Sequence, residues 1–147
     1  MTKKLLFLLL FVATATLGQA QVSKMIGEWN TFDDKTGDMR SAVRIYEEND
    51  GTYQAVVTTI YEKDANGKYH VMKAPFPKEY EGAIGTKIFR EMKVHGDHLK
   101  GKVYDPESQK TYHGKVTYHA KHDELVLRGS LDKAGVLGRS QTWKRKK

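Results

Sequence analysis

The sequence predicts an all-β protein, a single up-and-down antiparallel β-barrel of eight or nine strands. From residue 26 onward, apolar and polar side chains alternate over short segments, turn residues separate these segments at even intervals, and no stretch keeps the period of an amphipathic helix. Consecutive hairpins of similar length favour a closed barrel, because closure leaves no sheet edge exposed. A two-sheet β-sandwich is the alternative architecture.

Each predicted strand is a run in which apolar, aromatic and β-branched side chains alternate with polar ones. In chain order the runs are residues 26–32, 39–47, 52–61, 69–73, 86–94, 99–104, 111–120, 124–131 and 136–145. Asn49 and Gly51 mark a hairpin between the second and third runs, since both tolerate the positive φ of a tight turn. Pro75 and Pro77 lack backbone donors, so residues 73–85 are expected to form the one long loop.

Two turns carry carboxylates that are expected to be structural. Their residues are Asp33, Asp34, Gly37, Asp105 and Pro106. Aspartate accepts hydrogen bonds from nearby backbone N–H groups, glycine supplies a permissive φ, and proline fixes the backbone at the start of its turn. The functional alternative is that the three aspartates gather at one mouth of the barrel and bind a cation or a basic ligand. No calcium-loop spacing supports that alternative.

The first twenty residues have the pattern of a secretory signal peptide. Lys3 and Lys4 precede an apolar run over residues 5–17, and Gly18-Gln19-Ala20 is a small-x-small cleavage site. A membrane anchor is the alternative, but crossing a bilayer takes about 20 apolar residues and this run is shorter. We therefore predict a cleaved signal peptide at 1–20, export to the periplasm or, alternatively, secretion, and no integral membrane segment after cleavage. Residues 21–147 would form one barrel domain with a short basic tail.

Composition excludes several functional classes. The chain has no cysteine, which rules out a disulfide scaffold, a cysteine-ligated metal and a thiol nucleophile. Its formal net charge of +7 comes from dispersed basic residues, so nucleic acid is not an expected partner. The six histidines fall on turns or on the face opposite the tyrosines, so neither a metal site nor a cofactor is expected. No catalytic motif is present and the protein is predicted not to be an enzyme, although carboxylates from distant strands can still meet.

The two tryptophans lie on the strands that must pair if the barrel closes. Trp29 is on the first run and Trp143 on the last. An arginine stacked on Trp29 would seal that end of the barrel through a cation–π contact, and the candidates are Arg128, Arg139 and Arg145. The alternative is that both tryptophans are ordinary core aromatics.

Four ordered motifs resemble a known bacterial family. They are Trp29-x-Thr31-x-Asp33-Asp34-x-Thr36-Gly37, then Val103-Tyr104-Asp105-Pro106-Glu107-x-x-Lys110-Thr111-Tyr112, then Arg128-Gly129, and Gly138-Arg139-Ser140-Gln141-Thr142-Trp143-x-Arg145. Together they are similar to the exported family called domain of unknown function 2147, over residues 26–145. The resemblance implies a lipocalin-like or calycin-like small β-barrel with no assigned activity or catalytic residue. Gln109 departs from the family, whose turn often has glycine there.

The predicted interior suggests a binding function without catalysis. Side chains expected to line the lumen are Tyr53, Val57, Tyr104, Tyr112, Val116, Tyr118 and Leu127. Gly101, Gly114 and Gly129 would share the inner face, where they either let the sheet coil or leave space. If they leave space, the barrel binds a small apolar or amphipathic molecule, with residues 73–85 as a candidate lid. The alternative is a ligandless barrel that binds a protein or envelope partner through its outer surface.

Overall fold

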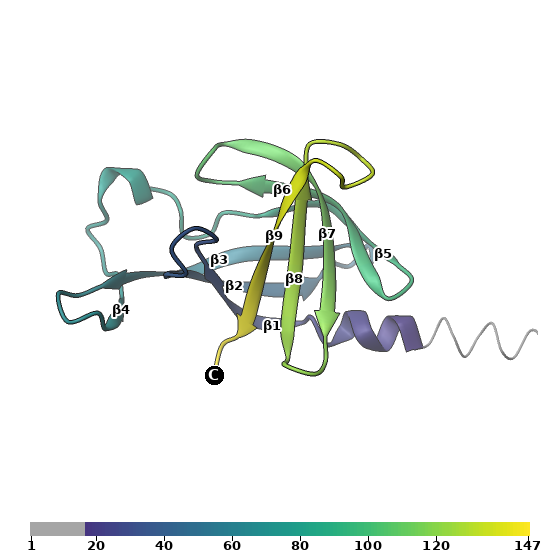
Figure 1. Cartoon of the computed structure of the whole chain (residues 1–147), viewed down its shortest axis with the longest axis horizontal. Coiled ribbons are helices and arrows are strands. Elements are labelled where there is room, and N and C mark those ends of the chain that lie inside the picture. Colours follow the sequence, from purple (N-terminus) through teal and green to yellow (C-terminus); the bar gives the residue numbers. More distant parts are fainter. Residues whose placement is uncertain (1–16) are drawn as a thin grey trace, which may run out of the picture.

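A computed structural model describes residues 17–147 of the chain (Figure 1). The strands are β1 (Gly27–Phe32), β2 (Met39–Glu47), β3 (Tyr53–Lys63), β4 (Tyr69–Val71), β5 (Phe89–His95), β6 (His98–Asp105), β7 (Lys110–His119), β8 (Glu124–Ser130) and β9 (Gly138–Arg145). A short helix precedes β1 at residues 17–23, and a single 3-10 turn, η1 (Lys78–Tyr80), lies between β4 and β5. Most of the expected signal peptide, residues 1–16, lies outside the described residues.

Eight of the strands close into an antiparallel barrel, which confirms the predicted fold. Around the barrel the order is β1, β2, β3, β5, β6, β7, β8 and β9, while β4 adds to the edge of β3. The seam between β9 and β1 pairs Trp29 with Arg145 and Asn30 with Lys144. Because the ladder is continuous through this seam, the chain does not form the two separate sheets of a sandwich.

Most predicted strand boundaries lie within one or two residues of the observed ones. The largest difference is at β5, which begins at Phe89 and not at residue 86, and two other differences have a clear cause. β8 ends at Ser130, and Leu131, which the pattern assigned to the strand, is 70% exposed. β9 begins at Gly138 because the Asp132 carboxylate accepts hydrogen bonds from the backbone N–H groups of Val136 and Leu137. These bonds keep both residues in the loop, since a side-chain acceptor replaces the strand partner.

The two ends of the barrel differ in how they are covered. Short turns connect β2 to β3, β5 to β6 and β7 to β8 at one end, and the helix at 17–23 lies beside it (Figure 1). Val22, in that helix, and Met25, just after it, are buried in the core. The connections at the other end include the long segment between β3 and β5. Within residues 17–147 no helix has the length and apolar character needed to span a bilayer.

Candidate functional site

The end of the barrel beside the N-terminal helix is closed by Trp29. Its side chain is fully buried, and its indole N–H donates to the Met25 carbonyl oxygen at 2.8 Å. The Tyr118 ring packs against it edge to face, with the ring centroids 6.4 Å apart. Trp29 and Tyr118 therefore fill this end with aromatic carbon, which excludes water from the core.

Arg145 covers Trp29 from outside and ties three chain segments together. Its guanidinium carbon lies 4.1 Å from the Trp29 ring centroid, so Arg145 is the predicted cation–π partner. Nε and Nη2 donate to the two carboxylate oxygens of Asp123 at 2.8 and 3.0 Å. Nη2 also donates to the Lys24 carbonyl oxygen and Nη1 to that of Ile26, at 2.7 and 3.2 Å. One side chain thus joins β9, the β7–β8 turn and the segment before β1.

The contacts around Arg145 lower the pKa of Asp123 and raise that of Tyr118. Hydrogen bonds from Arg145 are the main cause that lowers the pKa of Asp123, and a hydrogen bond from the Tyr118 hydroxyl acts in the same direction. That hydrogen bond to Asp123, 2.9 Å long, raises the pKa of Tyr118. Asp123 therefore stays ionised and Tyr118 neutral around neutral pH, which is the charge state that the cluster needs.

The other predicted closing residues lie elsewhere. Trp143 is buried on the inner face of β9 and stacks on Phe89, with the ring centroids 6.4 Å apart. Arg139 is at the opposite end of the barrel and pairs with Asp34 at 3.3 Å. Arg128 lies on β8 and donates to the carbonyl oxygens of residues 135 and 136. Of the three candidate arginines, only Arg145 reaches Trp29.

A cavity of about 920 Å³ opens at the end opposite Trp29. Its depth is apolar, lined by the buried side chains of Val57, Ile60, Ile88, Val103, Leu127 and Trp143. Its mouth is charged, lined by Asp33, Asp34, Arg40, Glu79, Asp105, Glu107 and Arg139. Binding pockets for small molecules are of order 300–1,000 Å³ and combine apolar walls with a few placed polar groups. The cavity has that size and that composition.

The predicted lumen residues divide between this cavity and the packed core. Val57, Tyr112 and Leu127 line the cavity, whereas Tyr53, Val116 and Tyr118 are not among its lining residues. Tyr53 and Val116 are buried core side chains. Tyr104 lies at the rim, but it follows Val103 and therefore faces outward from β6, with the Arg90 guanidinium 5.3 Å from its ring centroid.

The three inner-face glycines do different things. A Cβ at Gly101 would clash with the Glu91 carbonyl oxygen, and one at Gly114 would clash with the Val103 side chain. These two glycines allow close approach within the coiled sheet. A Cβ at Gly129 would meet only the Tyr112 Cβ, at 3.8 Å, and Gly129 lines the cavity. Both predicted roles are therefore present: Gly101 and Gly114 let the sheet coil, and of these three glycines only Gly129 leaves space.

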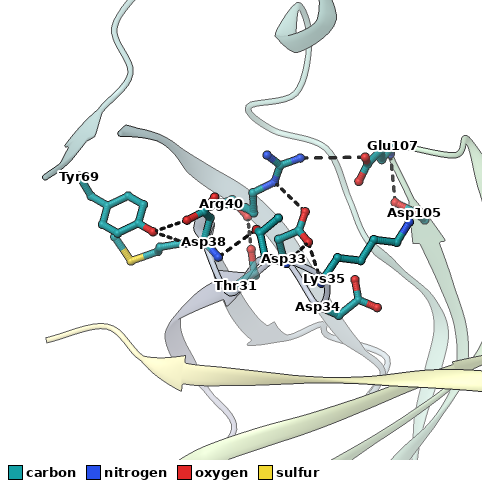
Figure 2. A network of polar contacts seen from close by, with 12 residues as sticks. Thr31, Asp33, Asp34, Lys35, Asp38, Arg40, Tyr69, Asp105 and Glu107 are labelled. Atoms are coloured by element: carbon teal, nitrogen blue, oxygen red, sulfur yellow. Dashed lines mark hydrogen bonds and ion pairs between the residues drawn. The ribbon is translucent and has the colours of Figure 1, made fainter. Parts of the chain in front are cut away.

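The mouth brings together the three turn aspartates (Figure 2). The Asp33 carboxylate lies 3.8 Å from Arg40 Nε, while Arg40 Nη2 lies 4.0 Å from the Glu107 carboxylate. Asp34 pairs with Arg139 from the start of β9. Arg40 and Glu107 thus link the β1–β2 turn to the β6–β7 turn across the cavity opening.

Two of these aspartates also build their own turns, as predicted. Asp33 Oδ1 accepts hydrogen bonds from the backbone N–H groups of Lys35 and Thr36, which are the main cause of its lowered pKa. Asp105 accepts from the Glu107 backbone N–H at 3.0 Å and from the Ser108 hydroxyl at 2.8 Å. Within residues 17–147 no three histidine, aspartate or glutamate side chains converge in a way that would hold a metal ion.

Sequence reasoning missed some residues that define the site. Asp123 falls between the predicted strands at 111–120 and 124–131, and no local pattern shows that its carboxylate meets Arg145 from the far end of the chain. Glu79 and Tyr80, from the predicted long loop, line the cavity, as do Arg40 and Glu107. Arg40 is the second residue of β2, just after the aspartate turn, and this position in the sequence was the available signal that it lies near the mouth.

Gln109 occupies a strained backbone position at the mouth. Its φ is +57°, a conformation that costs a residue with a Cβ roughly 1 to 2 kcal/mol and costs glycine little. We expect Gln109→Gly to raise the free energy of unfolding by about 1 kcal/mol, after the extra freedom of the unfolded glycine is deducted. Urea denaturation measures this change. Ser108→Gly is the control and should lower stability, since it removes the hydroxyl that donates to Asp105.

The family described as "Uncharacterized protein conserved in bacteria (DUF2147)" matches residues 27–145. The chain belongs to this family. The match runs from the first residue of β1 to the last of β9, so the DUF2147 region is the barrel itself. No curated protein matches the chain.

A solved structure has a similar fold. It is described as "Protein HP1028 from the human pathogen Helicobacter pylori belongs to the lipocalin family". The two chains are 22% identical, with a TM-score of 0.60, and the alignment covers 84% of this chain and 83% of that one. The fold of this DUF2147 member is therefore lipocalin-like.

Proposed function

We propose that this protein binds a small amphipathic molecule in its barrel without transforming it. The observation that carries the proposal is the cavity of about 920 Å³, closed at one end by Trp29 and open at the other. An interior filled by side chains would instead have favoured a ligandless interaction module, the alternative considered from the sequence. The lipocalin-like fold is consistent with the binding of small molecules.

The distribution of polar groups favours an amphipathic ligand over a purely apolar one. An apolar body would lie against Val57, Val103, Leu127 and Trp143, because burying hydrocarbon there releases water from both surfaces. A polar end would remain among the carboxylates and guanidinium groups of the mouth. A molecule that is apolar throughout would partly desolvate those charged groups and offer them no hydrogen bond in return, which is costly.

The mouth carboxylates are better suited to shaping the opening than to acid–base catalysis. Backbone N–H groups bound to Asp33 lower its pKa, so this carboxyl stays ionised and is a poor proton donor at neutral pH. Asp34 is paired with Arg139. Binding without catalysis is therefore the function that these contacts support.

We also propose that the barrel works outside the cytoplasm, most simply in the periplasm. The support comes from the sequence: two lysines, the apolar run over residues 5–17, and the small residues before Gln21. Mass spectrometry of protein from the periplasmic fraction is expected to give a chain that begins at Gln21. A chain that retains Met1 and remains in the cytoplasm would contradict this part of the proposal.

The binding proposal is tested with the fluorescence of Trp143, which lines the cavity while Trp29 does not. Titration with a panel of fatty acids and isoprenoid alcohols is expected to change the emission saturably for at least one compound. Trp143→Phe should remove most of that change and leave the emission of Trp29. Native mass spectrometry of protein purified from its own cells should show the bound molecule. An empty barrel with no response to the panel would overturn the proposal.

A further inference from the structure

The outer face of the barrel carries a row of basic residues across four strands. Lys93 on β5 pairs in register with Lys100 on β6, and Lys100 pairs with Lys115 on β7. Lys115 in turn pairs with Arg128 on β8. Directly opposite residues in antiparallel strands have Cβ atoms about 5 Å apart, so these side chains are close neighbours.

A second basic row runs parallel to the first, one step nearer the mouth. Arg90 pairs with Lys102, and Lys102 pairs with His113. We call the two rows together the basic wall; its residues are Arg90, Lys93, Lys100, Lys102, His113, Lys115 and Arg128. One carboxylate, Glu91, lies on β5 between Arg90 and Lys93, at the irregularity in the β5–β6 register, and its side chain is exposed. Two others lie in turns at the ends of the wall: the pKa of Asp50 is lowered in part by Lys93, and that of Asp97 in part by Lys115.

The lysines of the wall have no ion-pair partner in the part of the chain that the structure describes. Among residues 17–147, the ion pairs within 4.0 Å do not include Lys93, Lys100, Lys102 or Lys115. Like charges directly opposite one another destabilise a sheet. The wall therefore lowers the stability of the isolated barrel, and a negatively charged surface placed against it would remove that cost.

An exposed apolar loop lies beside the basic wall. Leu131, Val136 and Leu137 in the β8–β9 loop are 70%, 74% and 65% exposed. The loop is well ordered by hydrogen bonds, because Asp132 accepts from the backbone N–H groups of both Val136 and Leu137. Its aliphatic side chains are thus held in water by a fixed backbone, at a cost that a purely connecting loop does not require.

Arg128 joins the apolar loop to the wall. It belongs to the first basic row, and its guanidinium donates to the carbonyl oxygens of Gly135 and Val136 at 2.7 and 3.2 Å. The loop therefore contacts the outer face of β8 through Arg128, whose partner on β7 is Lys115, and it lies at the mouth end of the barrel, where β8 is connected to β9 (Figure 1). Leu131 and Leu137 also line the cavity edge.

We propose that the basic wall and the β8–β9 loop together dock the barrel on a bilayer that contains anionic phospholipid. The lysines would contact the headgroups, and the exposed aliphatic side chains would enter the interface between headgroups and acyl chains. Clustered basic residues beside a small apolar insertion are the usual combination for peripheral membrane binding. In this orientation the β8–β9 loop, two of whose residues also line the cavity, lies at the membrane surface. Docking does not depend on the cavity having a ligand.

A bilayer suits the basic wall and the β8–β9 loop better than nucleic acid does. Aliphatic side chains at the loop gain little from a duplex, whose outer surface is phosphate and sugar, but they gain from leaving water at a lipid interface. Binding of single strands relies on exposed aromatic side chains on which bases stack. The exposed large apolar side chains among the described residues are all aliphatic.

The test is co-sedimentation of the full chain with vesicles of phosphatidylcholine that contain phosphatidylglycerol. We expect binding that weakens with added salt and is much weaker to phosphatidylcholine alone. Each basic residue near an anionic surface contributes about fivefold to binding. Lys93→Gln/Lys100→Gln/Lys115→Gln should therefore weaken binding at least about tenfold, and Val136→Glu should weaken it severalfold.

The matched control is Lys68→Gln/Lys73→Gln/Lys121→Gln, which removes the same charge from exposed lysines outside the wall. It should bind vesicles nearly as well as the unchanged protein. All variants are compared in the same form, with or without the predicted signal peptide, so any contribution from residues 1–20 is common to them. Equal loss in both triple variants would overturn the proposal, as would equal binding to both kinds of vesicle. Wall-dependent binding to a DNA duplex without vesicle binding would also overturn it. Each variant's circular dichroism spectrum confirms that it is folded.

Discussion

Replacing Arg145 with alanine is expected to lower the free energy of unfolding by about 2 to 4 kcal/mol. Its two hydrogen bonds to Asp123 are charge-assisted, and such bonds contribute about 1.5 to 3 kcal/mol when they are well shielded. The cation–π contact with Trp29 adds about 0.5 to 2 kcal/mol. The total is below the sum of these ranges because the Arg145 and Asp123 side chains are 28% and 46% exposed.

Arg139→Ala is the matched control, since it removes the same side chain from the same strand. Arg139 is 67% exposed and makes one ion pair, with Asp34. Exposed pairs contribute less than about 1 kcal/mol, so its loss should be small. Urea denaturation of both variants measures the difference. Arg145→Lys should recover only part of the stability, because an ammonium group cannot bind both Asp123 oxygens in the planar geometry of a guanidinium. Equal effects of Arg145→Ala and Arg139→Ala would show that the closed end does not hold the barrel together as described.

The barrel was predictable because its signals are local and repeat along the chain. A strand with one face in the core must alternate, and a tight turn needs residues such as Asn49 and Gly51. Closure then follows from the count of hairpins and from the two tryptophan-bearing terminal strands. Where boundaries moved, as at Val136, a side-chain acceptor from the preceding turn took the place of a strand partner.

The site was less predictable because it depends on contacts between residues far apart in the sequence. Trp29 and the need for an arginine were predictable, but the choice among three arginines was not. Arg145 was selected by register, since it pairs directly with Trp29 across the seam. One half of the barrel interior is packed and the other is open, and this division depends on which inward side chains are long enough to fill the centre of the barrel. The alternation of apolar and polar residues shows whether a side chain points inward, but not whether there is empty space in front of it. Val57 and Val116 therefore look alike in the sequence, although only Val57 lines the cavity.

Gly129→Trp is expected to weaken ligand binding by at least about tenfold, or about 1.4 kcal/mol, while the barrel remains folded. Gly129 lies on the inner face between buried Leu127 and the rim residue Leu131, and a Cβ there meets nothing closer than 3.8 Å. An indole at this position would extend into the path from the mouth to the cavity depth. The apolar part of a ligand would then be kept away from Leu127 and Trp143. Displacement of a fluorescent fatty acid measures the change.

The control for Gly129→Trp adds the same ring outside the barrel. Thr142 is exposed on β9, and since it precedes Trp143, whose side chain lies inside, it faces outward. Thr142→Trp should bind the probe as the unchanged protein does. A stronger effect of Thr142→Trp than of Gly129→Trp would place the ligand on the outer surface and contradict the cavity. A folded Gly129→Trp variant with unchanged affinity would mean that the ligand does not pass this point. The cavity depth would then not be the binding site, however well its size and lining suit an amphipathic molecule.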